Sequence, residues 1–230
     1  MSRLLALTLD LDDTLWPVWP TIVRAERRLH DWLAEHAPAT AQRHDTAAMR
    51  ALRDRVGLEH PERQHDLTWL RMESLRRALS QAGDDPALAV PGFEVFFDER
   101  QRVELFDDVR PGLERLAARF PLVALTNGNA DLGRIGLAPL FRGVVTARSF
   151  GVGKPDPRIF AAACELAGAP AGQVLHVGDD LLLDVEGALR AGVQAAWLKR
   201  PSIHPVPPAA PQGVHFVVED LLALADAVGA

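Results

Sequence analysis

The sequence predicts an α/β fold: a doubly wound, Rossmann-like parallel sheet with an all-α insertion. From residue 106 onward, short apolar runs alternate with amphipathic segments and short loops, which is typical of repeated βα units in a parallel sheet. Residues 4–9 form an apolar run without alternating polar residues, which suits a strand buried on both faces. Residues 17–105 lack such runs and place apolar residues at helical spacing. We therefore expect a core formed by residues 1–16 and 106–230, with residues 17–105 as a separate helical domain.

The insertion begins with a stiff segment. Residues 16–20 contain two tryptophans and two prolines, which cannot continue a strand and are expected to form a connector. Beyond it, apolar residues at helical spacing predict amphipathic helices around residues 22–33, 49–56 and 67–79. A further segment, residues 92–106, is helical but less regular. The insertion is thus expected to contain helices only.

The core resumes the alternation of strands and helices. Runs rich in Leu, Val and Ala, bounded by glycine, proline or polar residues, predict strands at 121–125, 143–145, 173–177, 193–198 and 215–218. Helical spacing predicts helices at 113–119, 158–167, 184–191 and 221–228, with a short helix before Phe141. Residues 201–211 are a proline-rich loop.

The composition narrows the class of protein. A chain of 230 residues that is 48% hydrophobic and 24% charged can bury a sizeable core. A net charge of −6 shows no basic surface for nucleic acid or an anionic membrane. Cys164 is the single cysteine, so no intramolecular disulfide can form, and no segment has the length of a membrane helix. We expect a cytoplasmic protein, either a monomer or a homodimer, with a small molecule as its partner.

An acidic cluster follows the first predicted strand. Asp10, Asp12 and Asp13 come directly after the apolar run, and Thr14 is next. Carboxylates at the end of a buried strand repel one another and are costly to desolvate. In an open α/β sheet this strand end is also where ligands bind, so a divalent cation, a lysine or both are expected there. The alternative is a solvated acidic turn.

Three other polar clusters also stand where a predicted strand ends or a helix begins. They are Thr126-Asn127-Gly128, Lys154, and Asp179-Asp180 with Asp184. Parallel strands bring such ends to one edge of the sheet. Asp10, Asp12, Asp179 and Asp184 together carry four negative charges against the one positive charge of Lys154, so a cation is required. Mg²⁺ suits oxygen ligands and works with phosphate. A hydroxyl, a glycine turn and a lysine suit a phosphoryl group.

The sequence does not match the common motifs for nucleotide binding or serine hydrolysis. Gly151-Val152-Gly153-Lys154 has the wrong spacing for a phosphate-binding loop of the Walker type, because residue 148 is Arg and residue 155 is Pro. Neither a dinucleotide-binding glycine fingerprint nor a serine-hydrolase elbow is present in the sequence. His176 lies inside an apolar run, which indicates a buried supporting histidine rather than a metal ligand.

Taken together, the four motifs resemble those of the haloacid dehalogenase superfamily of phosphohydrolases. The resemblance covers residues 1–16 and 106–230, and residues 17–105 fall where members carry a helical cap. It implies an aspartyl-phosphate intermediate on Asp10, with Asp12 as general acid and then general base. The site residues it implies for Mg²⁺ are Asp10, Asp12 through its backbone carbonyl, and Asp179, with Asp184 either a ligand through water or an orienting residue. Those it implies for the phosphoryl group are Thr126, Asn127, Gly128 and Lys154.

The resemblance also bears on the reaction and the substrate. Asp12 favours a phosphatase over a 2-haloacid dehalogenase, because the dehalogenating members have no aspartate two residues after the nucleophile. The local sequence around Asn127 and Asp179 is similar to that of a bacterial branch of the family, whose members act on FMN and 5-amino-6-(5-phospho-D-ribitylamino)uracil. Trp16, Trp19 and Trp69 could then face a flat ring. A sugar-phosphate or phosphoglycolate phosphatase, a phosphomutase and a receiver-like signalling module stay open as alternatives.

Overall fold

The structure is a computed structural model that describes residues 3–203, 209 and 212–230. Much of the predicted proline-rich loop lies outside these residues. The chain divides into two compact units, one formed by Met1–Pro17 with Glu104–Ala230 and the other by Val18–Val103. Within the described residues, no helix combines the length and the apolar character that crossing a bilayer requires.

The first unit contains a parallel sheet, as the sequence predicts. The described residues form six strands in the order β3-β2-β1-β4-β5-β6, and every neighbouring pair is parallel. The central strand β1 pairs with β2 on one side and β4 on the other, which is the point at which the strand order reverses. The strands are β1 (Ala6–Leu9), β2 (Leu122–Thr126), β3 (Gly143–Thr146), β4 (Val174–Gly178), β5 (Gln194–Leu198) and β6 (Phe216–Val218).

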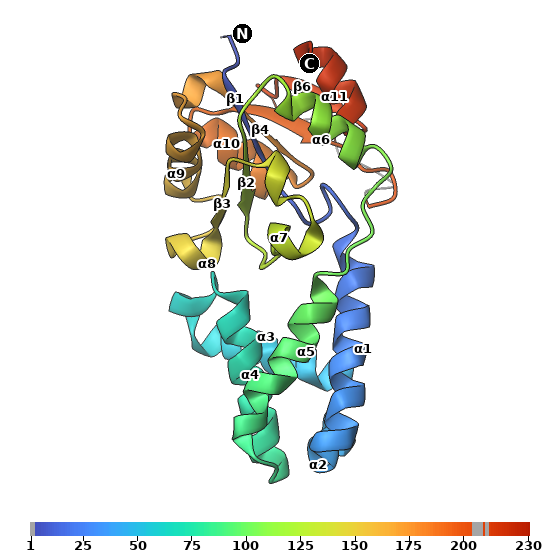
Figure 1. Cartoon of the computed structure of the whole chain (residues 1–230). Coiled ribbons are helices and arrows are strands. Elements are labelled where there is room, and N and C mark those ends of the chain that lie inside the picture. The colour runs from blue at the N-terminus through green and yellow to red at the C-terminus, as the bar shows by residue number, and fades with distance from the viewer. Residues whose placement is uncertain (1–2, 204–208, 210–211) are drawn as a thin grey trace. The chain divides into compact units, whose positions relative to one another are not determined.

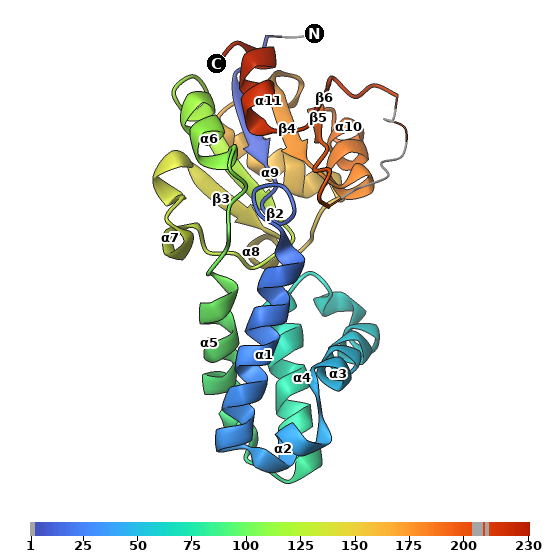
Figure 2. The same cartoon turned by 90° about the vertical axis from the view of Figure 1, so that its right-hand side faces the viewer.

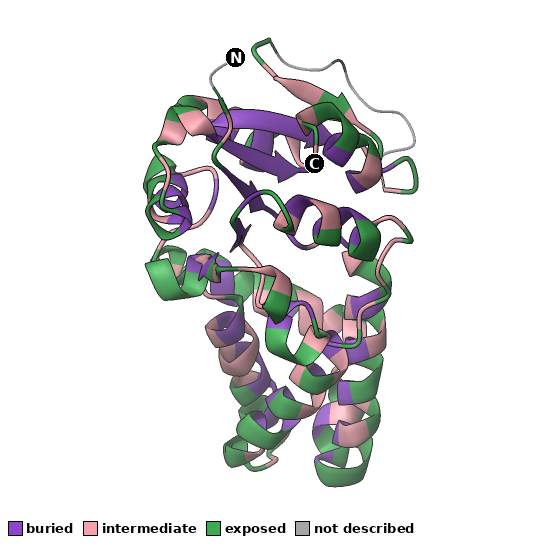
Figure 3. Cartoon of the chain, turned by 45° about the horizontal axis from the view of Figure 1, so that its top comes forward, coloured by how far each residue is buried: buried purple, intermediate pink, exposed green. Residues whose placement is uncertain are grey.

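Helices cover both faces of this sheet (Figures 1 and 2). On one face α9 (Pro157–Ala167) packs on the strands beside α10 (Gly187–Arg190), and on the other α6 (Val109–Ala117) packs against α11 (Leu221–Val228). Strands β1, β2, β4 and β5 are buried at every residue, which Figure 3 shows as purple arrows. The predicted doubly wound α/β fold is confirmed. Shorter helices are α7 (Leu132–Ile135), α8 (Ala147–Phe150), η3 (Ala138–Leu140), η4 (Ala171–Gln173) and the π-helix η5 (Leu181–Glu186).

The second unit is helical throughout. Its core consists of side chains such as Leu33, Leu79 and Phe96, which come from three different helices. Asp45 and Asp66 cap the N-termini of the third and fourth helices with their side chains, as aspartate commonly does. The helices are α1 (Val18–His36), α2 (Pro38–Arg43), α3 (Thr46–Glu59), η1 (Pro61–Arg63), α4 (Leu67–Ala82), η2 (Pro86–Leu88) and α5 (Ala89–Arg100).

Several predicted boundaries differ from the structure; for example, the helix predicted at 113–119 is α6 and begins at Val109. The connector predicted at 16–20 is shorter, because α1 begins at Val18 and a proline at residue 20 is tolerated in the first turn. The helix predicted at 92–106 is α5 and ends at Arg100. The helix predicted at 184–191 begins earlier, at Leu181, because Asp180 caps it by accepting hydrogen bonds from two backbone N–H groups.

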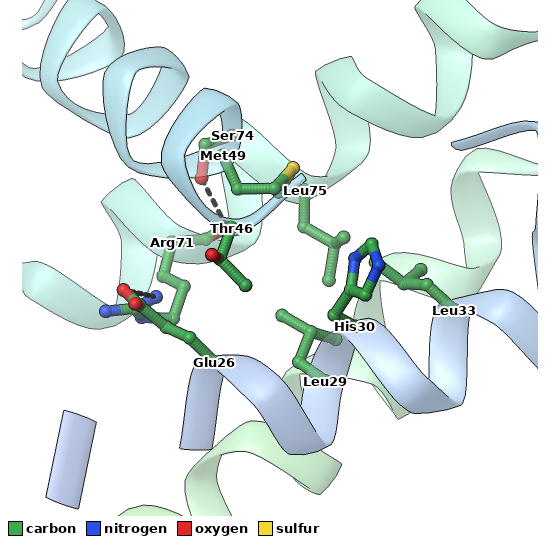
Figure 4. A pocket seen from close by; sticks show the side chains of 9 residues that line it. All are labelled: Glu26, Leu29, His30, Leu33, Thr46, Met49, Arg71, Ser74 and Leu75. Carbon is green, nitrogen blue, oxygen red and sulfur yellow. Dashed lines mark hydrogen bonds and ion pairs between the residues drawn. The ribbon is translucent and has the colours of Figure 1, made fainter. Parts of the chain in front are cut away.

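A small pocket lies among α1, α3 and α4 (Figure 4). Leu29, Leu33 and Leu75 line it, and Arg71 lies 3.6 Å from Glu26 at one end. Glu26 is buried and also pairs with Arg50 at 2.6 Å, so its charge is compensated inside the helical unit.

The contact between α6 and α11 depends on a glycine. A Cβ atom at Gly112 would lie 2.5 Å from the Cβ of Leu221. Alanine favours a helix by about 1 kcal/mol, but separating two packed helices costs about 1–3 kcal/mol. Because the clash involves a Cβ and the backbone of Leu221, we expect a cost at the upper end of this range, about 2–3 kcal/mol, so that Gly112→Ala lowers the free energy of unfolding by a net of about 1–2 kcal/mol in urea titrations. Gly172→Ala is the control, because a Cβ there meets nothing within 4 Å. Equal stability of Gly112→Ala and the wild type would contradict this account.

Candidate active site

The central strands bring three carboxylates together. Asp10 follows β1, its backbone N–H donates to the carbonyl of Val177 in β4, and Asp179 directly follows β4. One carboxylate oxygen from each of Asp10, Asp179 and Asp184 lies within 4.8 Å of the others, and all three residues are buried. The strand order therefore places acids that are far apart in the sequence at one edge of the sheet.

Lys154 bridges two of these acids. Its Nζ donates to Asp10 Oδ1 at 2.5 Å and to Asp184 Oδ1 at 2.6 Å, and the residue is only 6% exposed. Burial alone would lower the pKa of Lys154, but the carboxylates of Asp10 and Asp184 outweigh it and raise that pKa above its ordinary value. The lysine is therefore a permanent positive charge in the site.

The pKa values of Asp10 and Asp184 shift in opposite directions. Burial raises the pKa of Asp10 well above its usual range, against the charge of Lys154, and the neighbouring Asp184 and Asp179 carboxylates raise it further. Burial also acts on Asp184, but Lys154 and the hydrogen bond from His176 hold the pKa of Asp184 below its usual range. One lysine does not balance three carboxylates, so a cation would favour ionisation of Asp10.

His176 supports Asp184 from inside the sheet. Its Nε2 lies 3.1 Å from Asp184 Oδ1 and its Nδ1 lies 2.8 Å from the hydroxyl of Thr8. Burial lowers the pKa of His176, opposed by Asp184, so the neutral ring donates from Nε2 and accepts at Nδ1. The other Asp184 oxygen accepts from the backbone N–H of Asp180 at 3.0 Å. Both oxygens of Asp184 are thereby oriented.

The turn after β1 orients Asp179, the third acid of the cluster. Thr14 is fully buried, and its hydroxyl donates to Asp179 Oδ1 at 2.9 Å, with Asp10 Oδ2 3.4 Å away. Asp13 adopts φ = 60°, a left-handed conformation that aspartate tolerates better than most residues. Asp13 thus shapes the turn.

Asp12 belongs to the same turn and is half-buried. The indole N–H of Trp16 donates to Asp12 Oδ1 at 2.8 Å. A Cβ at Gly128 would lie 2.4 Å from Asp12 Oδ2, so only glycine lets the carboxylate lie this close to the turn after β2. The backbone N–H of Gly128 donates to Thr126 Oγ1 at 2.9 Å. Asp12, Thr126 and Gly128 are therefore neighbours.

Asn127 joins the turn after β2 to the lysine. Its Nδ2 donates to the backbone carbonyl of Lys154 at 2.9 Å, and the Lys154 N–H donates to Asn127 Oδ1 at 2.7 Å. In this structure the amide positions the backbone of Lys154. A direct contact of Asn127 with phosphate stays a prediction.

Comparison with known proteins now adds a second line of support. The family described as haloacid dehalogenase-like hydrolases matches residues 4–192. The chain belongs to this family. The chain is 37% identical over 203 residues to the 5-amino-6-(5-phospho-D-ribitylamino)uracil phosphatase YigB of Escherichia coli (strain K12), covering 86% of this chain and 85% of the relative. The prediction of this branch is confirmed as a similarity.

Two further relatives are named for different hydrolytic reactions. A phosphoserine phosphatase of Thermus thermophilus is 39% identical over 136 residues, covering 56% of this chain and 55% of the relative. A crystal structure titled 2-haloacid dehalogenase, from Pseudomonas syringae pv. tomato, is 38% identical with a TM-score of 0.88 and covers 99% of this chain and 100% of its own. The chain is thus a hydrolase whose curated relatives include phosphatases, which confirms the predicted enzyme class.

The acids of this haloacid dehalogenase-like hydrolase fit a metal ion. Asp10, Asp179 and Asp184 offer carboxylate oxygens that converge, and hard divalent cations prefer such ligands. All eight predicted site residues lie in the same unit of the chain, and the structure brings them to one edge of the sheet. Asp180 instead caps η5. The sequence indicated Trp16 as a face for a substrate ring, whereas the structure buries it and makes it a donor to Asp12, four residues before it. The sequence did not indicate Arg200 as a partner of the site.

Proposed function

We propose that this protein is a Mg²⁺-dependent phosphatase that hydrolyses small-molecule phosphate monoesters through an aspartyl-phosphate on Asp10. The observation that carries the proposal is the position of Asp12 in the turn that follows Asp10, with its carboxylate against the turn after β2. Its carboxylate is held by Trp16 and lies against Gly128, with the buried Lys154–Asp10 pair in the same site. Such a pair of aspartates can supply a nucleophile and a proton donor.

The reaction proceeds in two steps. Asp10 attacks phosphorus, the bond from phosphorus to the ester oxygen breaks, and Asp12 donates a proton to the leaving alkoxide. Asp12, now ionised, takes a proton from water, and the resulting hydroxide attacks phosphorus to release inorganic phosphate and regenerate Asp10. Lys154 and the turn from Thr126 to Gly128 stabilise the phosphoryl oxygens.

Mg²⁺ would be held by the side chains of Asp10, Asp179 and Asp184 and by the backbone carbonyl of Asp12. When bound, it would supply positive charge opposite the phosphoryl oxygens and lower the cost of ionising Asp10. His176 and Thr14 would keep the acids oriented for it, since they bond Asp184 and Asp179 respectively.

A specific observation separates phosphatase from dehalogenase. Halide leaves without a proton, so Asp12 would have no role in a dehalogenase, whereas an alkoxide leaving group requires one. The hydrogen bond from Trp16 and the space beside Gly128 both serve this carboxylate. We therefore favour phosphatase activity, although one protein of similar structure is named a 2-haloacid dehalogenase.

For the substrate, we propose FMN or a riboflavin-pathway phosphate, with sugar phosphates and phosphoglycolate as the second choice. The similarity to the E. coli phosphatase supports the first, and a phosphoglycolate phosphatase among the relatives supports the second.

We also propose that the helical unit is the cap that selects the substrate. Trp19 is 57% exposed there and Trp69 is partly exposed, whereas Trp16 is fully buried and offers no open face. A cytoplasmic location and the oligomeric state stay predictions.

Phosphate release from a panel of monoesters tests the proposal. The panel contains FMN, sugar phosphates, phosphoglycolate and p-nitrophenyl phosphate, each measured with Mg²⁺ and with EDTA. We expect release that EDTA suppresses, and no halide from 2-chloropropionate. Halide release without phosphate release would favour the dehalogenase. Stable phosphorylation by acetyl phosphate without turnover would favour a receiver-like module, and phosphate transfer between sugar positions a phosphomutase.

The glycine beside Asp12 gives a direct prediction. In Gly128→Ala the new Cβ would lie 2.4 Å from Asp12 Oδ2, so the carboxylate must move by about 1 Å to reach ordinary contact. A displacement of this size at a reacting group can lower a rate by about 10²-fold. We expect that loss in kcat with p-nitrophenyl phosphate, and almost none in the control Gly172→Ala. Wild-type kcat in Gly128→Ala would show that the carboxylate position is unimportant.

A further inference from the structure

A buried arginine from the C-terminal part of the chain contacts the turn after β1. Arg200 follows β5, is 4% exposed, and lies beyond the residues 4–192 that match the family. Its Nε and Nη2 both donate to the backbone carbonyl of Thr14, at 3.0 and 2.9 Å. This carbonyl belongs to a turn that carries Asp10 and Asp12.

Arg200 is itself held firmly. Its Nη1 and Nη2 donate to the two carboxylate oxygens of Asp108, at 2.7 and 3.0 Å, and its guanidinium lies 4.3 Å from the ring centre of Phe106. Asp108 also accepts from the backbone N–H of Leu221, the first residue of α11. A planar guanidinium with donors on two sides can make all these bonds at once, which an ammonium group cannot.

Thr14 connects this arginine to the acidic cluster. Its carbonyl accepts from Arg200 while its hydroxyl donates to Asp179. A hydroxyl has one proton, so the 2.9 Å bond to Asp179 is the main one and the 3.4 Å contact with Asp10 is secondary. Fixing the backbone of Thr14 therefore fixes the direction of the proton that Asp179 accepts.

We propose that Arg200 is a positioning residue for the metal-binding acids. It clamps the Thr14 carbonyl so that the Thr14 hydroxyl orients Asp179 toward a divalent cation. The inference rests on the proposed function, because it takes Asp179 as a metal ligand. It assigns a role in the site to a residue that follows β5 and lies outside the four motifs in the sequence.

Direct titration of Mg²⁺ tests the proposal. Arg200→Lys keeps the positive charge near Asp108 but loses the pair of hydrogen bonds to the Thr14 carbonyl. We expect the Kd for Mg²⁺, measured by calorimetry on folded protein, to rise about tenfold. Arg115→Lys is the matched control, because Arg115 bonds Asp226 and the Ala230 carbonyl and does not contact Thr14. Its Kd should stay within about twofold of the wild type. An unchanged Kd in folded Arg200→Lys overturns the proposal.

A double-mutant cycle separates positioning from general loosening. Thr14→Val removes the hydroxyl but keeps the carbonyl, and should also raise the Kd for Mg²⁺. If Arg200 acts through that hydroxyl, adding Arg200→Lys to Thr14→Val changes the Kd by less than about twofold. Independent tenfold effects that multiply would overturn the inference.

Two further measurements keep the outcome interpretable. If Arg200→Lys does not fold, Asp108→Asn replaces it in the cycle, because it weakens the support of Arg200 and leaves the bonds to Thr14 possible. Asp108→Asn should raise the Kd by a smaller factor, about threefold. An unchanged Kd in this variant would overturn the proposal. Mg²⁺ binding by the wild type without phosphatase activity would overturn the proposed function alone, since the Kd comparison does not depend on turnover.

Discussion

Asp10→Asn is expected to abolish turnover, with kcat lowered by about 10⁴-fold or more, the range seen when a covalent nucleophile is removed. The amide has nearly the shape of the carboxylate but cannot attack phosphorus. It can still accept a hydrogen bond from Lys154, which in the wild type bonds Asp10 Oδ1. The variant should therefore remain folded, as judged by circular dichroism. Steady-state phosphate release and mass spectrometry of acid-quenched protein measure the effect.

The matched control is Asp13→Asn in the same turn. Asp13 shapes the backbone through its left-handed conformation, which Asn also tolerates. We expect its kcat to stay within about threefold of the wild type. The phosphoenzyme mass should appear in wild type and Asp13→Asn and be absent from Asp10→Asn. Activity retained in Asp10→Asn would refute the assignment of the nucleophile.

Asp12→Asn is expected to slow formation of the phosphoenzyme by about 10²–10⁴-fold with alkyl phosphates and by less with activated aryl phosphates. An alkoxide is a poor leaving group without a proton, whereas p-nitrophenolate leaves readily. Asp12 also activates water in the second step, so hydrolysis of the intermediate slows for both substrates. With p-nitrophenyl phosphate we expect a burst of one equivalent of p-nitrophenol followed by slow turnover. Rapid-quench and stopped-flow measurements resolve the two phases.

Trp16→Phe is the companion variant for Asp12. It keeps a ring at a fully buried position and removes the N–H that donates to Asp12 Oδ1. We expect the same dependence on the leaving group with a smaller loss, about tenfold for alkyl phosphates, which is the value of one hydrogen bond to a charged group. An equal loss in Asp12→Asn for alkyl and aryl substrates, without a burst, would show that Asp12 does not act as general acid.

The sequence by itself determined the fold class, and it predicted the eight residues that the structure brings to one edge of the sheet. Apolar runs such as residues 4–9 indicate strands buried on both faces, and the repeated βα order permits few topologies. Polar residues that follow such strands, for example Asp10 and Asp179, must converge when the strands are parallel neighbours, and β1 and β4 are. These inferences need only local patterns and the geometry of a parallel sheet.

Only the tertiary structure decided how the acids are held. Trp16 bonds Asp12, Gly128 leaves space for that carboxylate, and Arg200 clamps Thr14 across a separation of 186 residues. Helix boundaries such as the start of α1 at Val18 were also decided there. The physical reason is that these contacts depend on side-chain packing and direction between segments far apart in the sequence, for which no local period exists. Composition and spacing predict which groups meet; the packed structure decides which atoms bond.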